Sequence, residues 1–124
     1  MTPIPFMSHC RIEELEAPEA TARLAVDAVD PLTNRRGEAH GGLLMTMLDI
    51  ALGKACQKVS EGATSFVTID LNVAFLAPGA GRIVAEGRVL RAGRSIVFCE
   101  GEARDCAGVL LARASGVFRP FVPR

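Results

Sequence analysis

The chain has 124 residues, 49% of them hydrophobic, and its 14 Lys and Arg residues are balanced by 14 Asp and Glu residues. A chain of this length forms one domain around a single core, and its zero net charge provides no field to attract nucleic acid or a membrane surface. The apolar content exceeds the needs of one small core, so we expect another subunit to cover part of the surface. We therefore predict one domain over residues 1–124 that self-associates.

The N-terminal stretch MTPIPFMSHC lacks the basic segment and long apolar run of a secretory signal. No run of about twenty apolar residues occurs anywhere, so we predict a cytoplasmic chain without a membrane segment. No two cysteines form a C-x-x-C pair, which gives little support to a zinc site or a disulfide framework. We interpret all four as small buried hydrophobic residues: Cys10, Cys56, Cys99 and Cys106.

Residues 10–27 predict a first hairpin, with alternating apolar positions on both sides of Ala17–Pro18. The first strand would start near residue 10, which leaves little room for a helix before it. The loop after the hairpin is rich in Pro, Asn and Gly, which tolerate turns. It leads into a helix without internal proline, predicted from about Gly41 to Val59.

Four more strands follow this helix. The first alternates cleanly, and its apolar residues are predicted to share one face: Val67, Ile69, Leu71, Val73 and Phe75. Short breaks at Ala92–Gly93 and Ala107–Gly108 divide the rest into three strands joined by hairpins. A helix that is apolar nearly all round needs a sheet on most sides. We predict an α+β fold, a curved antiparallel sheet of five to six strands wrapped around one long central helix.

One carboxylate, Asp49, interrupts the apolar helix. Its neighbours three and four positions away are uncharged: Met45, Thr46, Leu52 and Gly53. Burial without a partner disfavours an ionised carboxylate, so the pKa of Asp49 should rise or its side chain should have a partner from elsewhere. A structural hydrogen bond and a catalytic role both remain open at this point.

The helix start, His40-Gly41-Gly42, is a second signal. Amides at a helix N-terminus favour negative charge, and glycines let a ligand approach closely, so this start can serve as an oxyanion hole. Asp49 lies eight residues further, about 12 Å along a helix that rises about 1.5 Å per residue. A base must come within about 3–3.5 Å of the reacting atom. If both groups act on one carbonyl, the carboxylate comes from a second copy, which predicts a dimer with two shared sites.

The motif Asn34-x-x-Gly37-x-x-His40-Gly41-Gly42, followed by Asp49, resembles the hotdog-fold acyl-CoA thioesterases. The branch it resembles includes phenylacetyl-CoA and related medium-chain and aromatic thioesterases. The resemblance implies hydrolysis of an acyl-CoA to free acid and CoA by a homodimer that assembles further into a homotetramer. It implies that the Gly41 amide polarises the thioester carbonyl and that Gly42 aids its close approach. Asp49 of the facing subunit would act as general base or as nucleophile.

The resemblance also implies roles for residues around this centre. Asn34 would position the substrate or the attacking water, His40 would shape the loop near the thioester, and Thr68 would stand beside the water. Guanidinium groups suit CoA phosphates, and the candidates lie around the Gly93 turn: Arg88, Arg91 and Arg94. A solvated edge strand is the alternative interpretation of these arginines. No metal and no cofactor beyond the substrate's own CoA is expected.

Two other functions stay open. A hotdog enoyl-CoA hydratase or dehydratase would also use a His and a carboxylate for proton transfer. A non-catalytic acyl-CoA-binding protein would keep the fold and tolerate Asp49→Asn. The acyl group is not specified by the sequence; its pocket walls are expected among the apolar residues Leu44, Met45, Met47, Leu48 and Phe75.

Overall fold

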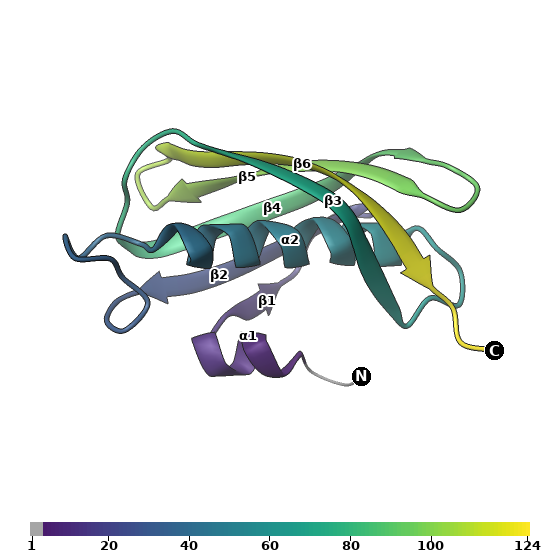
Figure 1. Ribbon diagram of the computed structural model, residues 1–124, viewed down its shortest axis with the longest axis horizontal. Coiled ribbons are helices and arrows are strands. Elements are labelled where there is room, and N and C mark those ends of the chain that lie inside the picture. Colours follow the sequence, from purple (N-terminus) through teal and green to yellow (C-terminus); the bar gives the residue numbers. More distant parts are fainter. Residues whose placement is uncertain (1–3) are drawn as a thin grey trace.

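The computed structural model describes residues 4–124 and shows an antiparallel sheet curled around a central helix (Figure 1). The sheet order is β1-β2-β4-β5-β6-β3, so β1 and β3 form its edges. The predicted α+β architecture is confirmed, with six strands. The elements are α1 (Pro5–Cys10), β1 (Glu13–Leu15), β2 (Thr21–Ala28), α2 (Gly41–Lys58), β3 (Ser65–Phe75), β4 (Gly81–Ala92), β5 (Val97–Asp105) and β6 (Leu110–Phe121).

Helix α2 fills the concave side of the sheet, and more than half of its residues are buried. Its core partners include Leu24 of β2, Ile83 of β4 and Phe118 of β6, all fully buried. The helix backbone lies directly on β4 at Gly87, where an added Cβ would stand 2.6 Å from the carbonyl of Ala51. The apolar helix therefore has the sheet cover that its sequence requires.

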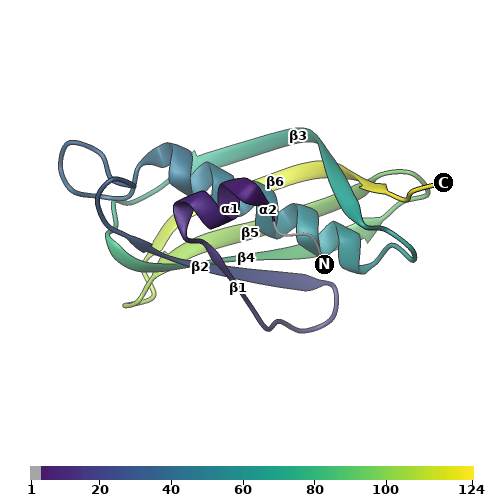
Figure 2. The ribbon, with the colours of Figure 1, turned by 90° about the horizontal axis from the view of Figure 1, so that it is seen from below.

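A short helix precedes the first strand, where the sequence was expected to leave little room for one. Pro5 stands at the start of α1, where proline is tolerated, and Arg11 ends the helix in the left-handed conformation. Met7 and Cys10, three residues apart, are its buried residues. Both views place α1 across the N-terminal half of α2 (Figures 1 and 2). The first strand therefore begins at Glu13 rather than near residue 10.

The alternation predicted for β3 breaks at a β-bulge between Thr68 and Asp70. Thr68 is paired with the buried Phe118, whereas the neighbouring Val67 is 48% exposed and the bulged Ile69 is 55% exposed. The single apolar face expected for this strand is therefore wrong at Val67 and Ile69. A bulge adds one residue to a strand and so shifts which side chains face the core.

Three of the four cysteines are buried as expected, but Cys106 is exposed in the turn between β5 and β6. A turn residue has no core to enter, which explains this correction. Burial raises the pKa of the Cys56 thiol to about 11 and that of Cys99 to about 12, and Cys56 adds to the second shift. Among the described residues, no helix is long and apolar enough to cross a membrane.

Candidate functional site

The start of α2 is organised by His40. This residue caps the helix, and its Nδ1 accepts a hydrogen bond of 2.8 Å from the Gly42 N–H. Because Nδ1 is the acceptor, the neutral ring carries its proton on Nε2. The Gly41 N–H, by contrast, donates to no acceptor within residues 4–124. One free amide therefore stands at the positive end of the helix.

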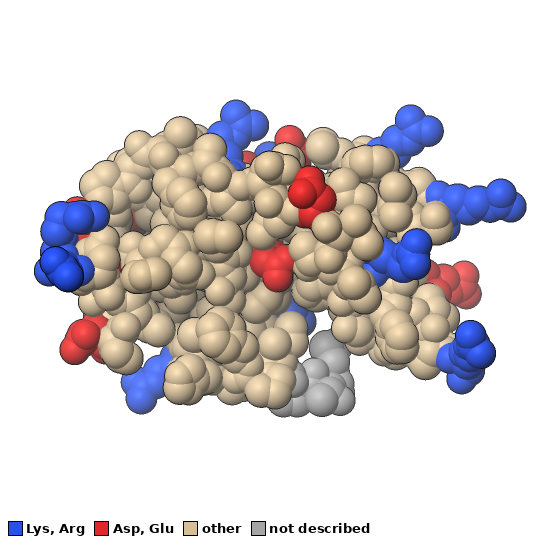
Figure 3. All heavy atoms as spheres, viewed as in Figure 1, with Lys and Arg blue, Asp and Glu red and all other residues tan. Residues whose placement is uncertain are grey.

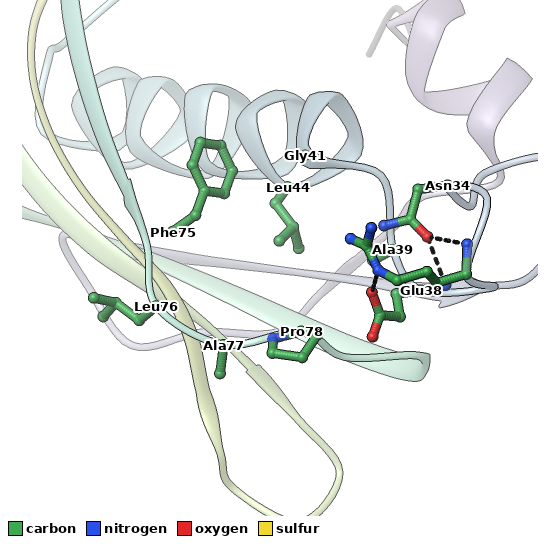
Figure 4. A pocket seen from close by; sticks show the side chains of 10 residues that line it. Asn34, Glu38, Ala39, Gly41, Leu44, Phe75, Leu76, Ala77 and Pro78 are labelled. Atoms are coloured by element: carbon green, nitrogen blue, oxygen red, sulfur yellow. Dashed lines mark hydrogen bonds and ion pairs between the residues drawn. The ribbon is translucent and has the colours of Figure 1, made fainter.

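The free amide borders a cleft of about 460 Å³ (Figure 4). Phe75, near the end of β3, leans over Gly41: a Cβ on this glycine would meet the ring at 3.5 Å. Leu44 lies one turn further along the helix, and Leu76, Ala77 and Pro78 close the side away from the helix. The cleft is thus apolar near α2 and polar toward the loop that precedes the helix.

Asn34 is held in this cleft by the loop backbone. Its Oδ1 accepts hydrogen bonds from the amides of Arg36 at 2.9 Å and Glu38 at 3.1 Å. With the oxygen occupied, the Nδ2 group is the part of the side chain available to a ligand. Arg36 donates to Glu38 at 2.6 Å and holds the pKa of that carboxyl below its ordinary value. Asn34 therefore presents donors to the same cleft that the Gly41 amide borders.

Asp49 has the partner that its apolar surroundings demand. Thr68 Oγ1 on β3 donates to Asp49 Oδ1 at 2.7 Å, and the aspartate is half-buried. The bulge that follows Thr68 leaves this hydroxyl on the helix side of the strand, opposite Phe118. Sequence reasoning named both residues, and the structure brings them together.

Asp49 does not line the cleft at Gly41. Helix α2 meets β3 at different points along the strand: Gly41 lies at Phe75, the last residue of β3, whereas Asp49 lies at Thr68, seven residues earlier. Within one chain, the amide and the carboxylate are therefore separated by about two turns of helix, on the order of 12 Å.

The three arginines predicted to meet phosphate do not form one cluster. Arg88 forms a bidentate pair with Glu102, at 2.8 and 2.9 Å, and also contacts Glu100 and Glu86. Its guanidinium is thereby committed to carboxylates on the outer face of the sheet. Arg91 and Arg94 are exposed near the turn between β4 and β5, and no ion pair engages them among the described residues.

A second cleft, of about 380 Å³, lies between α1 and the start of α2. Its walls include Phe6 and Cys10 of α1, Leu32 of the loop, and Leu43 and Thr46 of α2. Sequence reasoning missed it because α1 was not predicted. Of the expected pocket walls, Met47 and Leu48 are fully buried in the core and line neither this cleft nor the one at Gly41.

No group of three His, Cys, Asp or Glu side chains within the described part of the chain is arranged to hold a metal ion. The chemistry available at the helix start is that of a backbone amide, the Asn34 amide and an imidazole, while a hydrogen-bonded carboxylate lies further along the helix.

Comparison with known proteins adds a family match. Residues 36–112 match the model of the thioesterase superfamily. A "Putative esterase" of Halobacterium salinarum is 31% identical, over 94% of this chain and 84% of that protein. The medium/long-chain acyl-CoA thioesterase YigI of Salmonella typhimurium is 27% identical, over 93% of this chain and 84% of that protein. Two further curated relatives are covered over 62% and 64% of their own length.

The fold is also found among solved structures. The PaaI protein of Escherichia coli, from its phenylacetic acid degradation operon, superposes with a TM-score of 0.86 at 22% identity. The match covers 95% of this chain and 85% of that one. At this identity the likeness shows the shared fold.

Proposed function

Because the chain belongs to the thioesterase superfamily, we propose that it hydrolyses an acyl-CoA thioester to the free acid and CoA. The observation that carries this proposal is the Gly41 N–H at the start of α2, which has no acceptor in residues 4–124 and borders a cleft that also holds Asn34. A thioester oxygen at this amide would gain negative charge as a nucleophile adds to its carbonyl. The helix dipole and a preorganised donor stabilise that charge in the transition state.

The attacking side of the reaction requires a second copy of the chain. Strand β3 is an open edge of the sheet, and two such edges pair antiparallel around a two-fold axis. Because Thr68 and Phe75 lie toward opposite ends of β3, this pairing would carry Asp49 of the facing copy toward Gly41. We propose a homodimer with two shared sites, further paired as a homotetramer and working in the cytoplasm.

The surface around α2 and β3 suits such a contact. Figure 3 shows this face with most of its Lys and Arg toward the ends, while acidic groups stand in the middle among uncharged residues. Met45, Val67, Ile69 and Phe75 are exposed apolar residues of these two elements. The acidic residues within α2 and β3 are Asp49 and Asp70 alone. Exposed apolar side chains on a sheet edge are typical of a surface that another chain covers.

The proposed reaction uses one water and no other reactant. Asp49 takes a proton from the water, whose oxygen adds to the carbonyl carbon while the carbonyl oxygen rests at the Gly41 amide. The tetrahedral intermediate then collapses, the carbon–sulfur bond breaks, and CoA leaves as a thiolate that takes the proton held by Asp49, which restores the carboxylate. Direct attack by Asp49 through an acyl-enzyme is the other route open to this carboxylate. Thr68 fixes Asp49 in either case, and the Asn34 amide would position the substrate or the water.

The CoA phosphates would be met by Arg91 and Arg94, whose guanidinium groups are exposed. Arg88 is not part of this proposal, because its guanidinium is held by glutamates.

The test is release of free thiol from acetyl-, octanoyl-, palmitoyl- and phenylacetyl-CoA by wild type and by Asp49→Asn. We expect the variant to lose a factor of about a hundred or more in kcat, as is typical for a general base. Asp70→Asn is the matched control, since Asp70 is an exposed aspartate of β3 that contacts Asn72. No thiol release by wild type from any of the four would reject the proposal. Water addition to an enoyl-CoA without thiol release would indicate the hydratase. If the protein binds acyl-CoA without turnover and Asp49→Asn leaves that binding unaffected, the protein would be the non-catalytic binder.

A further inference from the structure

The cleft between α1 and α2 adjoins the proposed oxyanion site. Gly41 lines the first cleft and the next residue, Gly42, lines the second, so the two clefts lie at successive residues of one helix start. His40, which caps this helix, also lines the second cleft. A carbonyl carbon held at the helix start carries two substituents. Each cleft can therefore receive one arm of a thioester.

The two clefts differ in chemistry. The Gly41 cleft contains the charged side chains of Arg36 and Glu38, paired with each other. Of the described residues that line the second cleft, none is Asp, Glu, Lys or Arg. Its floor is Cys10, 5% exposed, and Phe6 stands at its rim, 54% exposed. An aliphatic or aromatic group prefers the uncharged cleft, whereas the polar amides of a pantetheine arm suit the charged one.

We propose that the second cleft binds the acyl group of the substrate, and that α1 sets the limit on its length. This inference rests on the thioesterase function proposed above. At about 30 Å³ per non-hydrogen atom, the liquid share of a water molecule, the volume of about 380 Å³ holds on the order of ten atoms. That size suits a medium-chain or aryl acyl group. A long-chain acyl group would have to extend past Phe6 into solvent.

The absence of tryptophan from the sequence allows a direct binding test. Phe6→Trp places one fluorophore at the rim of the cleft, and the added substitution Asp49→Asn slows turnover. We expect octanoyl-CoA to shift the tryptophan emission of this double variant and CoA alone to leave it unchanged. Leu90→Trp with Asp49→Asn is the control, because Leu90 is 59% exposed on β4 and lines neither cleft. Calorimetric binding of octanoyl-CoA without a shift from Phe6→Trp would overturn the inference.

Kinetics provide the second test. Leu32→Trp narrows the cleft, so kcat/KM for octanoyl-CoA should fall tenfold or more while that for acetyl-CoA stays within about twofold, because each buried methylene contributes to binding. Leu90→Trp should change neither value. Phe6→Ala opens the rim and should raise kcat/KM for palmitoyl-CoA relative to octanoyl-CoA, whereas Phe98→Ala, on another exposed phenylalanine, should not.

The two proposals fail in different ways. If wild type releases no thiol from any acyl-CoA, the thioesterase function is rejected whatever the tryptophan reports. If wild type is active but Leu32→Trp and Phe6→Ala keep the chain-length profile of their controls, the acyl group binds elsewhere and only the present inference is lost. If Leu32→Trp fails to fold, Phe6→Ala still tests the inference, because Phe6 is more than half exposed and its replacement should leave the fold intact.

Discussion

Thr68 Oγ1 lies 2.7 Å from Asp49 Oδ1, and this hydrogen bond joins the middle of α2 to the edge strand β3. The hydroxyl donates, so it fixes one of the two oxygens of the Asp49 side chain. The other oxygen, Oδ2, remains available to a water or a substrate. Thr68 is thus a positioning residue for the proposed base, although it is exposed and would look like an ordinary β-favourable residue by type alone.

Two replacements of Thr68 distinguish the effect of its hydroxyl group on catalysis from the effect of its side-chain volume. Thr68→Val keeps the shape and removes the donor, so we expect kcat for octanoyl-CoA to fall about tenfold, less than for loss of the base itself. Thr68→Ser retains the donor and should stay within about threefold of wild type by the same reasoning. Both variants should keep the wild-type Tm. Equal kcat for the valine and serine variants would show that this hydrogen bond does not position Asp49.

The shared site can be tested by mixing two inactive variants. Asn34→Ala damages the cleft side and Asp49→Asn the carboxylate side. Co-refolded heterodimers then contain one intact site, built from Asn34 of one copy and Asp49 of the other. Random pairing gives half heterodimers, each with one of two sites intact, so the mixture should recover about a quarter of wild-type activity. Activity no higher than that of the separate variants would assign Asp49 to the site of its own chain.

Ile69 offers a test of the open edge. This bulged residue is 55% exposed in the single chain, and on our proposal it lies near the contact of two β3 edges. Ile69→Lys should shift the sedimentation of the protein toward the monomer of 13.2 kDa and reduce thiol release in parallel. Leu90→Lys is the control, since Leu90 is a similarly exposed apolar residue at the β4 irregularity. A dimer that persists in Ile69→Lys would exclude this edge as the interface.

Most of the fold could be predicted because its strands and its long helix follow from local patterns of apolar and polar residues. Strand alternation and short turns predicted β4, β5 and β6, whose connecting turns fall at the two predicted breaks, and the apolar helix implied its own sheet cover. The short helix α1 was missed since it has only two buried residues, Met7 and Cys10, and spans fewer than two turns, too few for a repeating apolar pattern. The bulge at Ile69 was also missed, because a bulge is fixed by the register with β6 and not by the strand's own sequence.

Site residues that lie on one element could be predicted from the sequence, whereas those that depend on the pairing of two strands could not. Gly41 and Asp49 are placed by one helix, so spacing alone separates them. The ion-pair partners of Arg88 depend on the pairing of β4 with β5, which places this residue opposite Glu100 and within reach of Glu102. Local sequence does not contain that register. For the same reason, the α1 cleft could not be predicted, since its walls come from α1, a loop and α2.

The ion pairs that Arg88 forms with glutamates predict that the stability of the fold depends on pH in the acid range. Two hydrogen bonds from Arg88 hold the pKa of Glu102 below its ordinary value of 4.5, and the side chain is only 19% exposed. A carboxyl whose pKa is lower in the folded protein than in the unfolded chain stabilises the fold above the unfolded value. That contribution is lost as the pH falls from about 4.5 through the folded pKa, because the folded state then binds the proton too.

Glu102→Gln should therefore lower the free energy of unfolding at pH 7 by on the order of 1 kcal/mol, a value kept small because Arg88 is partly solvated. The difference in Tm between wild type and this variant should narrow as the pH is lowered from 6 to about 3, because protonated Glu102 resembles glutamine in charge. Glu61→Gln, at an exposed glutamate for which no ion pair is found among the described residues, should show little difference at any pH. A Tm gap for Glu102→Gln that stays constant across this range would mean that the ion pair with Arg88 contributes no pH-dependent stability, and that the substitution acts through packing alone.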